Sequence, residues 1–143
     1  MEVRPLGASL GAEIIGADLA SPLNPGAMEA IKRALQDHLV IVFRDQQLQP
    51  ADQIRFGEQL GVLTEHPVFP HLQGYPPLIE IRNHGKPYAV NEHWHTDVSF
   101  APRPPAFTIL YALTMPTVGG DTQFANQYLA YEGLSTGMKK MLQ

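Results

Sequence analysis

The residues best suited to chemistry in this sequence are a histidine and an aspartate separated by one position, His95 and Asp97. On a β-strand, side chains two residues apart point to the same face, so an imidazole nitrogen and a carboxylate oxygen could meet at one point. That arrangement would supply two neighbouring positions of a metal coordination sphere. One further histidine would complete the facial triad that binds non-haem Fe(II) and leaves three positions open.

A less specific interpretation fits the same tripeptide. From average composition, a His-x-Asp occurs by chance in roughly one in several chains of this length. The two side chains would then form only a hydrogen bond on a solvent-exposed strand. The tripeptide alone therefore favours this second interpretation, and the surrounding sequence has to decide between them.

The elements around this pair are expected to be short. Proline and glycine account for 13 and 12 of the 143 residues, which favours brief helices and strands joined by turns over a helical bundle. Two short strands with a tight turn are expected within residues 6–19. A first helix is predicted from Pro25, because Asn24 can cap it and proline suits the first helical position. A second helix is predicted from Pro50 to Gly61.

Strands are expected to follow these helices, including the one that carries His95 and Asp97. The predicted strands span residues 39–43, 78–81, 94–100, 105–113 and 122–124. A long loop is expected at 63–77 and a closing helix at 129–142. Two early helices followed by strands indicate an α+β fold with a sheet core.

Composition excludes several classes of function. The net charge is −4 and no run of Lys or Arg exceeds two residues, which argues against a nucleic-acid partner. The absence of cysteine excludes disulfides, zinc–thiolate sites, iron–sulfur clusters and a cysteine nucleophile. The longest aliphatic and aromatic run, residues 39–43, is far too short to cross a membrane, and no signal peptide is recognisable. A cytoplasmic protein without a membrane partner is expected.

Five stretches, in order along the chain, decide between the two interpretations of the His-x-Asp. They are Gly11–Leu19, Val42–Gln46, His66–His71, Trp94–Phe100 and Gly119–Thr122. With these stretches the chain resembles the amino-terminal half of the taurine dioxygenase (TauD/TfdA) family of 2-oxoglutarate-dependent oxygenases. The resemblance implies a double-stranded β-helix, or jelly roll, with flanking helices, incomplete in this chain. Residues 1–143 would be the amino-terminal half of one such domain.

The resemblance also implies a role for individual residues. His95 and Asp97 match the first two iron ligands of the family, and Thr122 matches the threonine whose hydroxyl holds a carboxylate of 2-oxoglutarate. His66 and Asn91 match residues of the substrate pocket. Without the family, Thr122 would be interpreted as an ordinary strand threonine, and His66 and Asn91 as residues that pack in a loop.

The chain departs from the family pattern at two points. Phe69 stands where taurine-specific members have a tyrosine, so a hydroxyl that could bind an anionic substrate is missing, which puts taurine in doubt. Sulfonates related to taurine, sulfate esters and aryloxy acids remain as alternatives. In addition, no histidine follows His95. The third iron ligand and the arginine that pairs with 2-oxoglutarate are therefore not identifiable in this sequence.

We expect an Fe(II)- and 2-oxoglutarate-dependent dioxygenase that hydroxylates a small anionic substrate with O2 and releases succinate and CO2. The 143-residue chain alone is expected to be inactive. One alternative is a truncated, non-catalytic scaffold or partner-binding module; another is a metal hydrolase or cupin-like isomerase that uses the same His-x-Asp. Assembly into a homo-oligomer is left open.

Overall fold

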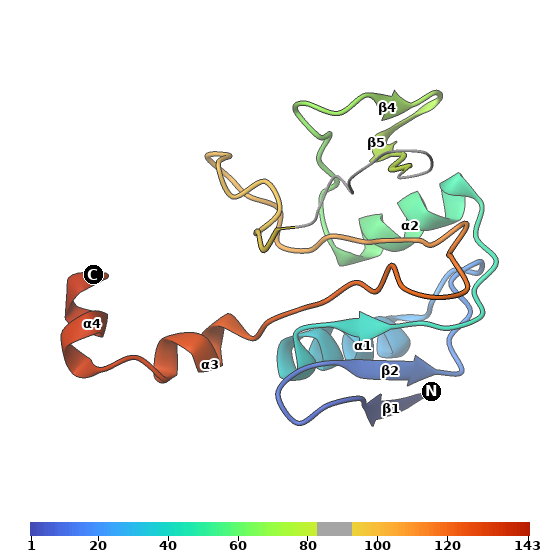
Figure 1. The fold of residues 1–143 in the computed structure, drawn as a ribbon. Helices are drawn as coiled ribbons and strands as arrows, with labels where there is room; N and C mark the ends of the chain where they lie inside the picture. The colour runs from blue at the N-terminus through green and yellow to red at the C-terminus, as the bar shows by residue number, and fades with distance from the viewer. Residues whose placement is uncertain (83–92) are drawn as a thin grey trace. The chain divides into compact units, whose positions relative to one another are not determined.

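The computed structural model describes residues 1–82 and 93–143, which divide into two compact units (Figure 1). The first unit comprises residues 1–47 and 114–143, and the second comprises residues 48–113. Each unit is described by itself below.

The first unit is built on a three-stranded sheet with one crossover helix. Strand β1 (Glu2–Pro5) pairs antiparallel with β2 (Ala12–Ile15). Helix α1 (Pro25–His38) then leads to β3 (Ile41–Val42), which pairs parallel with β2. The strand order is therefore β1-β2-β3, with β1 at one edge (Figure 1). A parallel connection of this kind requires a crossover, and α1 provides it.

Helix α1 begins where the sequence predicts. The Asn24 side chain accepts a hydrogen bond from the Ala27 amide at 2.9 Å, and proline occupies the first position of the helix. The helix ends at Leu39, whose φ of 66° breaks the helical backbone. The predicted first helix is confirmed.

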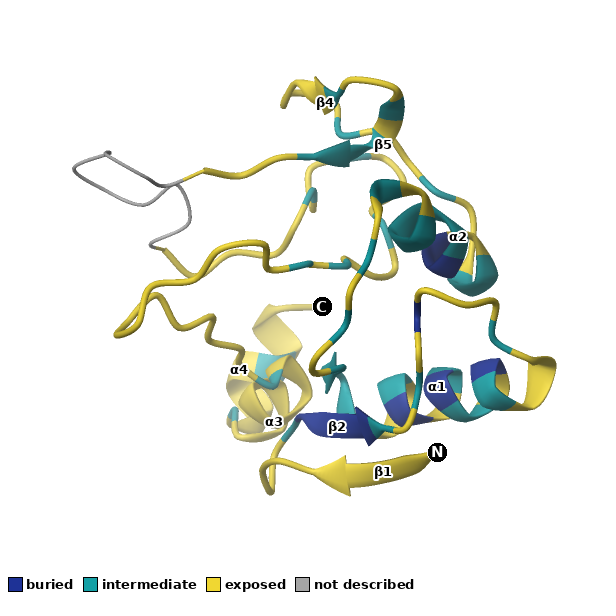
Figure 2. Cartoon of the chain, turned by 90° about the vertical axis from the view of Figure 1, so that its right-hand side faces the viewer, coloured by how far each residue is buried: buried dark blue, intermediate teal, exposed yellow. Residues whose placement is uncertain are grey.

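The core of the first unit lies between α1 and β2. Met28, Ile31 and Ala34 form one helical face and are buried, as are Ala12 and Ile14 on the strand (Figure 2). Because residues two apart on a strand share a face, both strand residues point to the same side of the sheet. This apolar layer fixes the helix on the sheet.

The other face of β2 carries a buried carboxylate. Glu13 is buried and binds the guanidinium of Arg4 on β1, while Arg44 lies 3.5 Å from its second oxygen. A buried charge is tolerated when it is paired in this way. The Gln46 side chain reinforces the same region, since it accepts from Leu19 N at 2.8 Å and donates to Ala17 O at 3.1 Å.

The second unit consists of one helix, one hairpin and irregular chain. Helix α2 (Pro50–Leu60) starts and ends where the sequence predicts, and Asp52 accepts a hydrogen bond from the Gln49 amide at 2.9 Å. Strands β4 (His71–Leu72) and β5 (Tyr75–Ile79) form an antiparallel hairpin.

Two expectations about the hairpin region were wrong. The loop expected at 63–77 contains β4 and the start of β5, and the strand expected at 78–81 begins earlier, at Tyr75. Gly74 has a φ of 81°, which allows the two-residue turn between the strands. Proline-rich sequence favoured a loop, but this small hairpin accommodates Pro76 and Pro77 within β5.

The strands expected later in the chain are also absent from the described residues. Residues 94–100, 105–113 and 122–124 form turns and irregular chain. Apolar alternation favours an extended backbone, but a strand exists only where a neighbouring strand pairs with it. In the described part of the chain, no strand pairs with these segments.

The remaining differences between the expected and the observed elements are strands that are shorter or shifted and a helix that is divided in two. The strand expected at 39–43 is reduced to β3, and the two strands expected within 6–19 become β1 and β2, the first of which starts at Glu2. The closing helix is split into α3 (Gln127–Glu132) and α4 (Thr136–Met141). Ser135 caps α4, because its Oγ accepts a hydrogen bond from the Met138 amide at 3.2 Å.

Helices and small sheets occur together, as an α+β fold requires. The described strands form one three-stranded and one two-stranded sheet, not a jelly roll, so the double-stranded β-helix stays a prediction. Among residues 1–82 and 93–143, no helix is both long and apolar enough to span a membrane.

Candidate functional site

His95 and Asp97 lie together in the second unit, His95 in irregular chain and Asp97 at the start of a turn that spans residues 97–100. The distance between His95 Nε2 and Asp97 Oδ1 is 3.1 Å, and the side chains are 46% and 45% exposed. The expected strand is replaced by a turn, in which Val98 has a φ of 50° and its carbonyl accepts from the Ala101 amide. The two side chains therefore meet across irregular chain that leads into a turn, and not through strand alternation.

The backbone carbonyl of His93 fixes the orientation of the His95 ring. It lies 2.8 Å from His95 Nδ1, which leaves Nε2 directed at Asp97. The hydrogen bond to His93 is the main cause of a raised pKa of His95, and the negative charge of Asp97 adds to it. A histidine held at Nδ1 by a carbonyl presents Nε2 in the way that metal-binding histidines commonly do.

His66 and Phe69 form a second cluster in the same unit. His66 Nδ1 accepts hydrogen bonds from the amides of Val68, at 3.2 Å, and Phe69, at 3.1 Å. An imidazole whose Nδ1 accepts carries its hydrogen on Nε2, so that atom can donate to an anion. The two rings are tilted by 51° with their centroids 4.8 Å apart. A hydrogen-bond donor and an exposed aromatic surface are thus side by side.

Thr122 belongs to the first unit, where it is exposed on irregular chain before α3. The preceding residues Gly119 and Gly120 have φ values of 76° and 75°, which glycine adopts without strain. A Cβ at Gly120 would lie 3.0 Å from the Pro116 side chain. Both glycines are therefore suited to the backbone that immediately precedes Thr122. Asn91, the remaining predicted pocket residue, lies outside the described residues.

The structure brings the predicted site residues together in two pairs, His95 with Asp97 and His66 with Phe69. In the described part of the chain, no cluster of three or more His, Cys, Asp or Glu could hold a metal ion. Sequence reasoning missed the partners that orient the two histidines, the His93 carbonyl and the amides of Val68 and Phe69. These are backbone groups, which every residue except proline carries in full, so no residue type could have revealed them.

A family model, described as taurine catabolism dioxygenase TauD, TfdA family, matches residues 2–143 of the chain. The alkylsulfatase of Acinetobacter baylyi is 37% identical over 98% of the chain and 44% of its own length. The alpha-ketoglutarate-dependent sulfate ester dioxygenase of Pseudomonas putida is 35% identical over 99% of the chain and 46% of its own length. The chain thus spans just under half the length of these relatives.

A solved structure supports the same assignment. It is a putative alpha-ketoglutarate-dependent taurine dioxygenase from Burkholderia xenovorans, 38% identical, which superposes with a TM-score of 0.87. The match covers 98% of the chain and 52% of that structure.

Proposed function

The chain belongs to the TauD, TfdA family, and from this membership we propose that the protein containing it is an Fe(II)- and 2-oxoglutarate-dependent dioxygenase. The proposed reaction hydroxylates a small anionic substrate and releases succinate and CO2. The observation that carries the proposal is the 3.1 Å approach of His95 Nε2 to Asp97 Oδ1, in a chain that matches the family model from residue 2 to residue 143.

The chemistry of this donor pair suits Fe(II). An imidazole nitrogen and a carboxylate oxygen are two of the three ligands of the facial triad, and both side chains are accessible to a metal from solvent. The family pattern has its third ligand after His95, where this sequence has no histidine, so the proposal takes that ligand from outside these 143 residues. When bound, iron and 2-oxoglutarate supply the activation of O2 and the electrons for hydroxylation.

The chain's own residues hold and orient these groups. The His93 carbonyl holds His95 Nδ1, so that Nε2 and the Asp97 carboxylate are presented together. Thr122 donates its hydroxyl to a carboxylate of 2-oxoglutarate in the proposed complex. Gly119 and Gly120 support that role, because their positive φ values shape the chain immediately before it.

The proposed substrates are sulfate esters of short alkyl chains. Two relatives support this choice by name, the alkylsulfatase and the sulfate ester dioxygenase. In this chain, His66 Nε2 would donate to a sulfate oxygen and the adjacent Phe69 ring would contact the alkyl chain. Phenylalanine in place of tyrosine favours an apolar group over a polar one at this position.

The products follow from the bonds that change. Hydroxylation of the carbon next to the ester oxygen places one atom of O2 on the substrate and the other in succinate. The hydroxylated carbon then expels sulfate as its C–O bond breaks, the hydroxyl proton is lost to solvent, and an aldehyde remains. Sulfate, succinate and aldehyde should therefore appear in equal amounts.

The test uses the full-length protein with hexyl sulfate, Fe(II), 2-oxoglutarate and O2. We expect equimolar succinate and sulfate, and neither product when 2-oxoglutarate is omitted. Sulfate release without 2-oxoglutarate would instead identify a metal hydrolase and overturn the proposal.

Substrate preference is tested with Phe69→Tyr. The added hydroxyl would stand where the alkyl chain of hexyl sulfate lies and would favour a polar group there, so kcat/KM for taurine relative to hexyl sulfate should rise about tenfold. Phe107→Tyr makes the same chemical change at an exposed ring elsewhere and should leave the ratio unchanged. An unchanged ratio in Phe69→Tyr would remove this residue from the substrate site.

A further inference from the structure

Helix α2 carries a glycine in its last turn, and a neighbouring leucine lies where the side chain of any other residue would begin. Gly57 is buried, and a Cβ atom at this position would lie 2.7 Å from Leu63 Cδ2 and 3.5 Å from Ile109 Cδ1. The first distance is shorter than real Cβ atoms show, whereas the second is an ordinary van der Waals contact. Leu63 therefore packs directly against the helix at Gly57.

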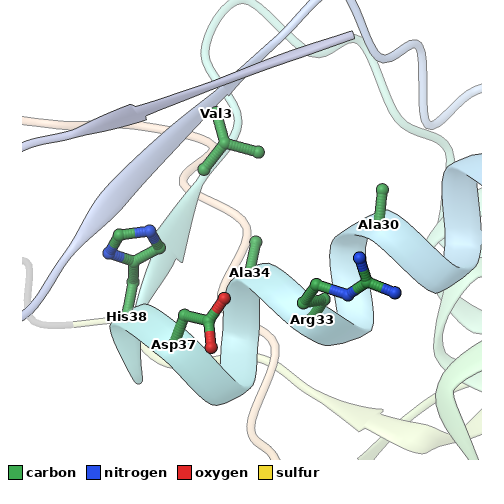
Figure 3. Close-up of a pocket in the computed structure, with 6 residues that line it drawn as sticks. All are labelled: Val3, Ala30, Arg33, Ala34, Asp37 and His38. Carbon is green, nitrogen blue, oxygen red and sulfur yellow. The ribbon is translucent and has the colours of Figure 1, made fainter.

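Small residues on helix α1 have a different consequence. Ala30 and Ala34 line a shallow groove beside Val3 of β1 (Figure 3). On α2, by contrast, the space beside Gly57 is filled by Leu63, from the chain that follows the helix. Glycine is less favourable than alanine within a helix, and the close approach of Leu63 is what it permits here. Gly57 thus provides an anchor point for the chain after α2.

The chain anchored at Gly57 leads directly to the second cluster of the candidate site. Two residues separate Leu63 from His66, so their Cα atoms lie within about 11 Å of each other. Pro67 and Pro70 further restrict the backbone around the cluster, because proline fixes its own φ angle. A displacement of Leu63 therefore reaches His66 over a short stretch of chain.

His66 and Phe69 form a unit that such a displacement would move as a whole. His66 Nδ1 accepts hydrogen bonds from the amides of Val68 and Phe69, at 3.2 Å and 3.1 Å. The centroids of the two rings are 4.8 Å apart. These contacts hold the imidazole and the aromatic ring together within four residues. The placement of the pair thus depends on where the preceding chain is anchored.

We propose that Gly57 is a positioning residue for the substrate. By admitting Leu63 it places His66 and Phe69, and through them it sets the preference for the length of the alkyl chain. This inference rests on the proposed function, in which His66 Nε2 donates to the sulfate and Phe69 contacts the alkyl chain. Gly57 is buried in α2 and acts only through Leu63.

The first test is Gly57→Ala in the full-length protein. The added methyl group collides with the end of the flexible Leu63 side chain, so the fold should persist while Leu63 moves. The ratio of kcat/KM for hexyl sulfate to that for ethyl sulfate should fall at least about fivefold, because Phe69 no longer meets the longer alkyl chain as it does in wild type. An unchanged ratio would overturn the proposal.

Gly61→Ala is the matched control. It adds the same methyl group at the end of α2, where no atom of the described residues beyond the chain neighbours lies within 4 Å. The φ of Gly61 is 172°, an extended conformation that alanine also adopts. The ratio in this variant should equal that of wild type.

A double variant tests whether Gly57 acts through Leu63. Leu63→Ala removes the side chain that Gly57 admits, and it should lower the same ratio. In this background Gly57→Ala should change the ratio by less than about twofold, because the atom with which it collides is gone. Independent, multiplicative effects of the two substitutions would overturn the proposal.

NMR of the full-length protein labelled with ¹⁵N provides a readout without turnover. The amide resonances of Val68 and Phe69 should shift in Gly57→Ala and stay in place in Gly61→Ala. Hydrogen exchange of both amides should remain as slow as in wild type, since their hydrogen bonds to His66 move intact. Unshifted resonances, or faster exchange caused by local unfolding, would each overturn the inference. Absence of alkyl sulfate turnover by wild type would instead remove the proposed function, and the resonances would still decide whether Gly57 positions the pair.

Discussion

At the scale of single residues, backbone groups set the chemistry of the candidate site. The His93 carbonyl and the Val68 and Phe69 amides determine which nitrogen of each histidine faces outward. A ligand histidine held at Nδ1 loses less conformational freedom when Nε2 binds a metal.

The carboxyl group of Asp52 gives a residue-scale prediction about pH. The pKa of Asp52 is lowered mainly by the hydrogen bond from the Gln49 backbone amide. The hydrogen bond from the Arg55 side chain is the next largest cause. Because the pKa of Asp52 is lower in the folded protein than the unfolded value of 3.8, the ionised carboxylate stabilises the folded state at pH values above 3.8. This stabilisation is lost as the pH falls through the pKa of the folded protein. The free energies of unfolding of wild type and Asp52→Asn should therefore differ at pH 6 and converge as the pH falls through the folded pKa. A difference that grows on acidification would show that the ionised form is not the stabilising one.

At the scale of elements, α1 and its contacts with β2 hold the first unit together. Ile31 is the largest fully buried side chain in the described part of the chain, with an exposed fraction of 0%. Ile31→Ala should lower the free energy of unfolding by about 3 kcal/mol, because it removes buried methyl groups and leaves a cavity. Chemical denaturation measures this loss, and a loss below about 1 kcal/mol would contradict the burial seen here.

The N-cap of α1 should contribute less to the free energy of unfolding than the buried Ile31 side chain does. Asn24→Ala removes the acceptor for the Ala27 amide and should cost about 1 kcal/mol. Asn24→Ser keeps a side-chain oxygen at the cap and should recover most of the loss in the same denaturation experiment. Equal losses in both variants would show that the cap hydrogen bond is not the cause.

Local signals explain which elements the sequence could predict. Both early helices were placed correctly, because Asn24, Pro25, Pro50 and Gly61 mark their ends. The later strands could not be placed, because pairing partners are not encoded in the segment that needs them. The proximity of His95 to Asp97 was predicted, but for the wrong reason. The sequence suggested a strand, whereas the two side chains meet in irregular chain at the start of a turn.

At the scale of the whole molecule, large apolar side chains remain exposed in the second half of the chain. Trp94, Phe100, Leu110, Leu113 and Val118 are each more than 60% exposed. A folded protein rarely leaves so many uncovered. The chain spans just under half the length of its relatives, and we propose that an additional segment of the full-length protein covers these side chains.

The same proposal predicts how the 143-residue polypeptide behaves when it is produced alone. It should bind a hydrophobic dye such as ANS more strongly, mole for mole, than the full-length protein. It should also form no succinate from 2-oxoglutarate with Fe(II) and hexyl sulfate, because the proposal takes the third ligand from outside these 143 residues. Turnover by this polypeptide alone would place all three ligands within its sequence.

The most direct test of the central claim is the iron content of the full-length protein after anaerobic loading with Fe(II) and removal of free metal. Wild type should retain about one iron per chain, and His95→Ala and Asp97→Ala should each retain less than about a tenth of that. His71→Ala removes an exposed histidine on β4, outside the two site pairs, and should match wild type. Full iron occupancy in either His95→Ala or Asp97→Ala would contradict the assignment of these two residues as metal ligands.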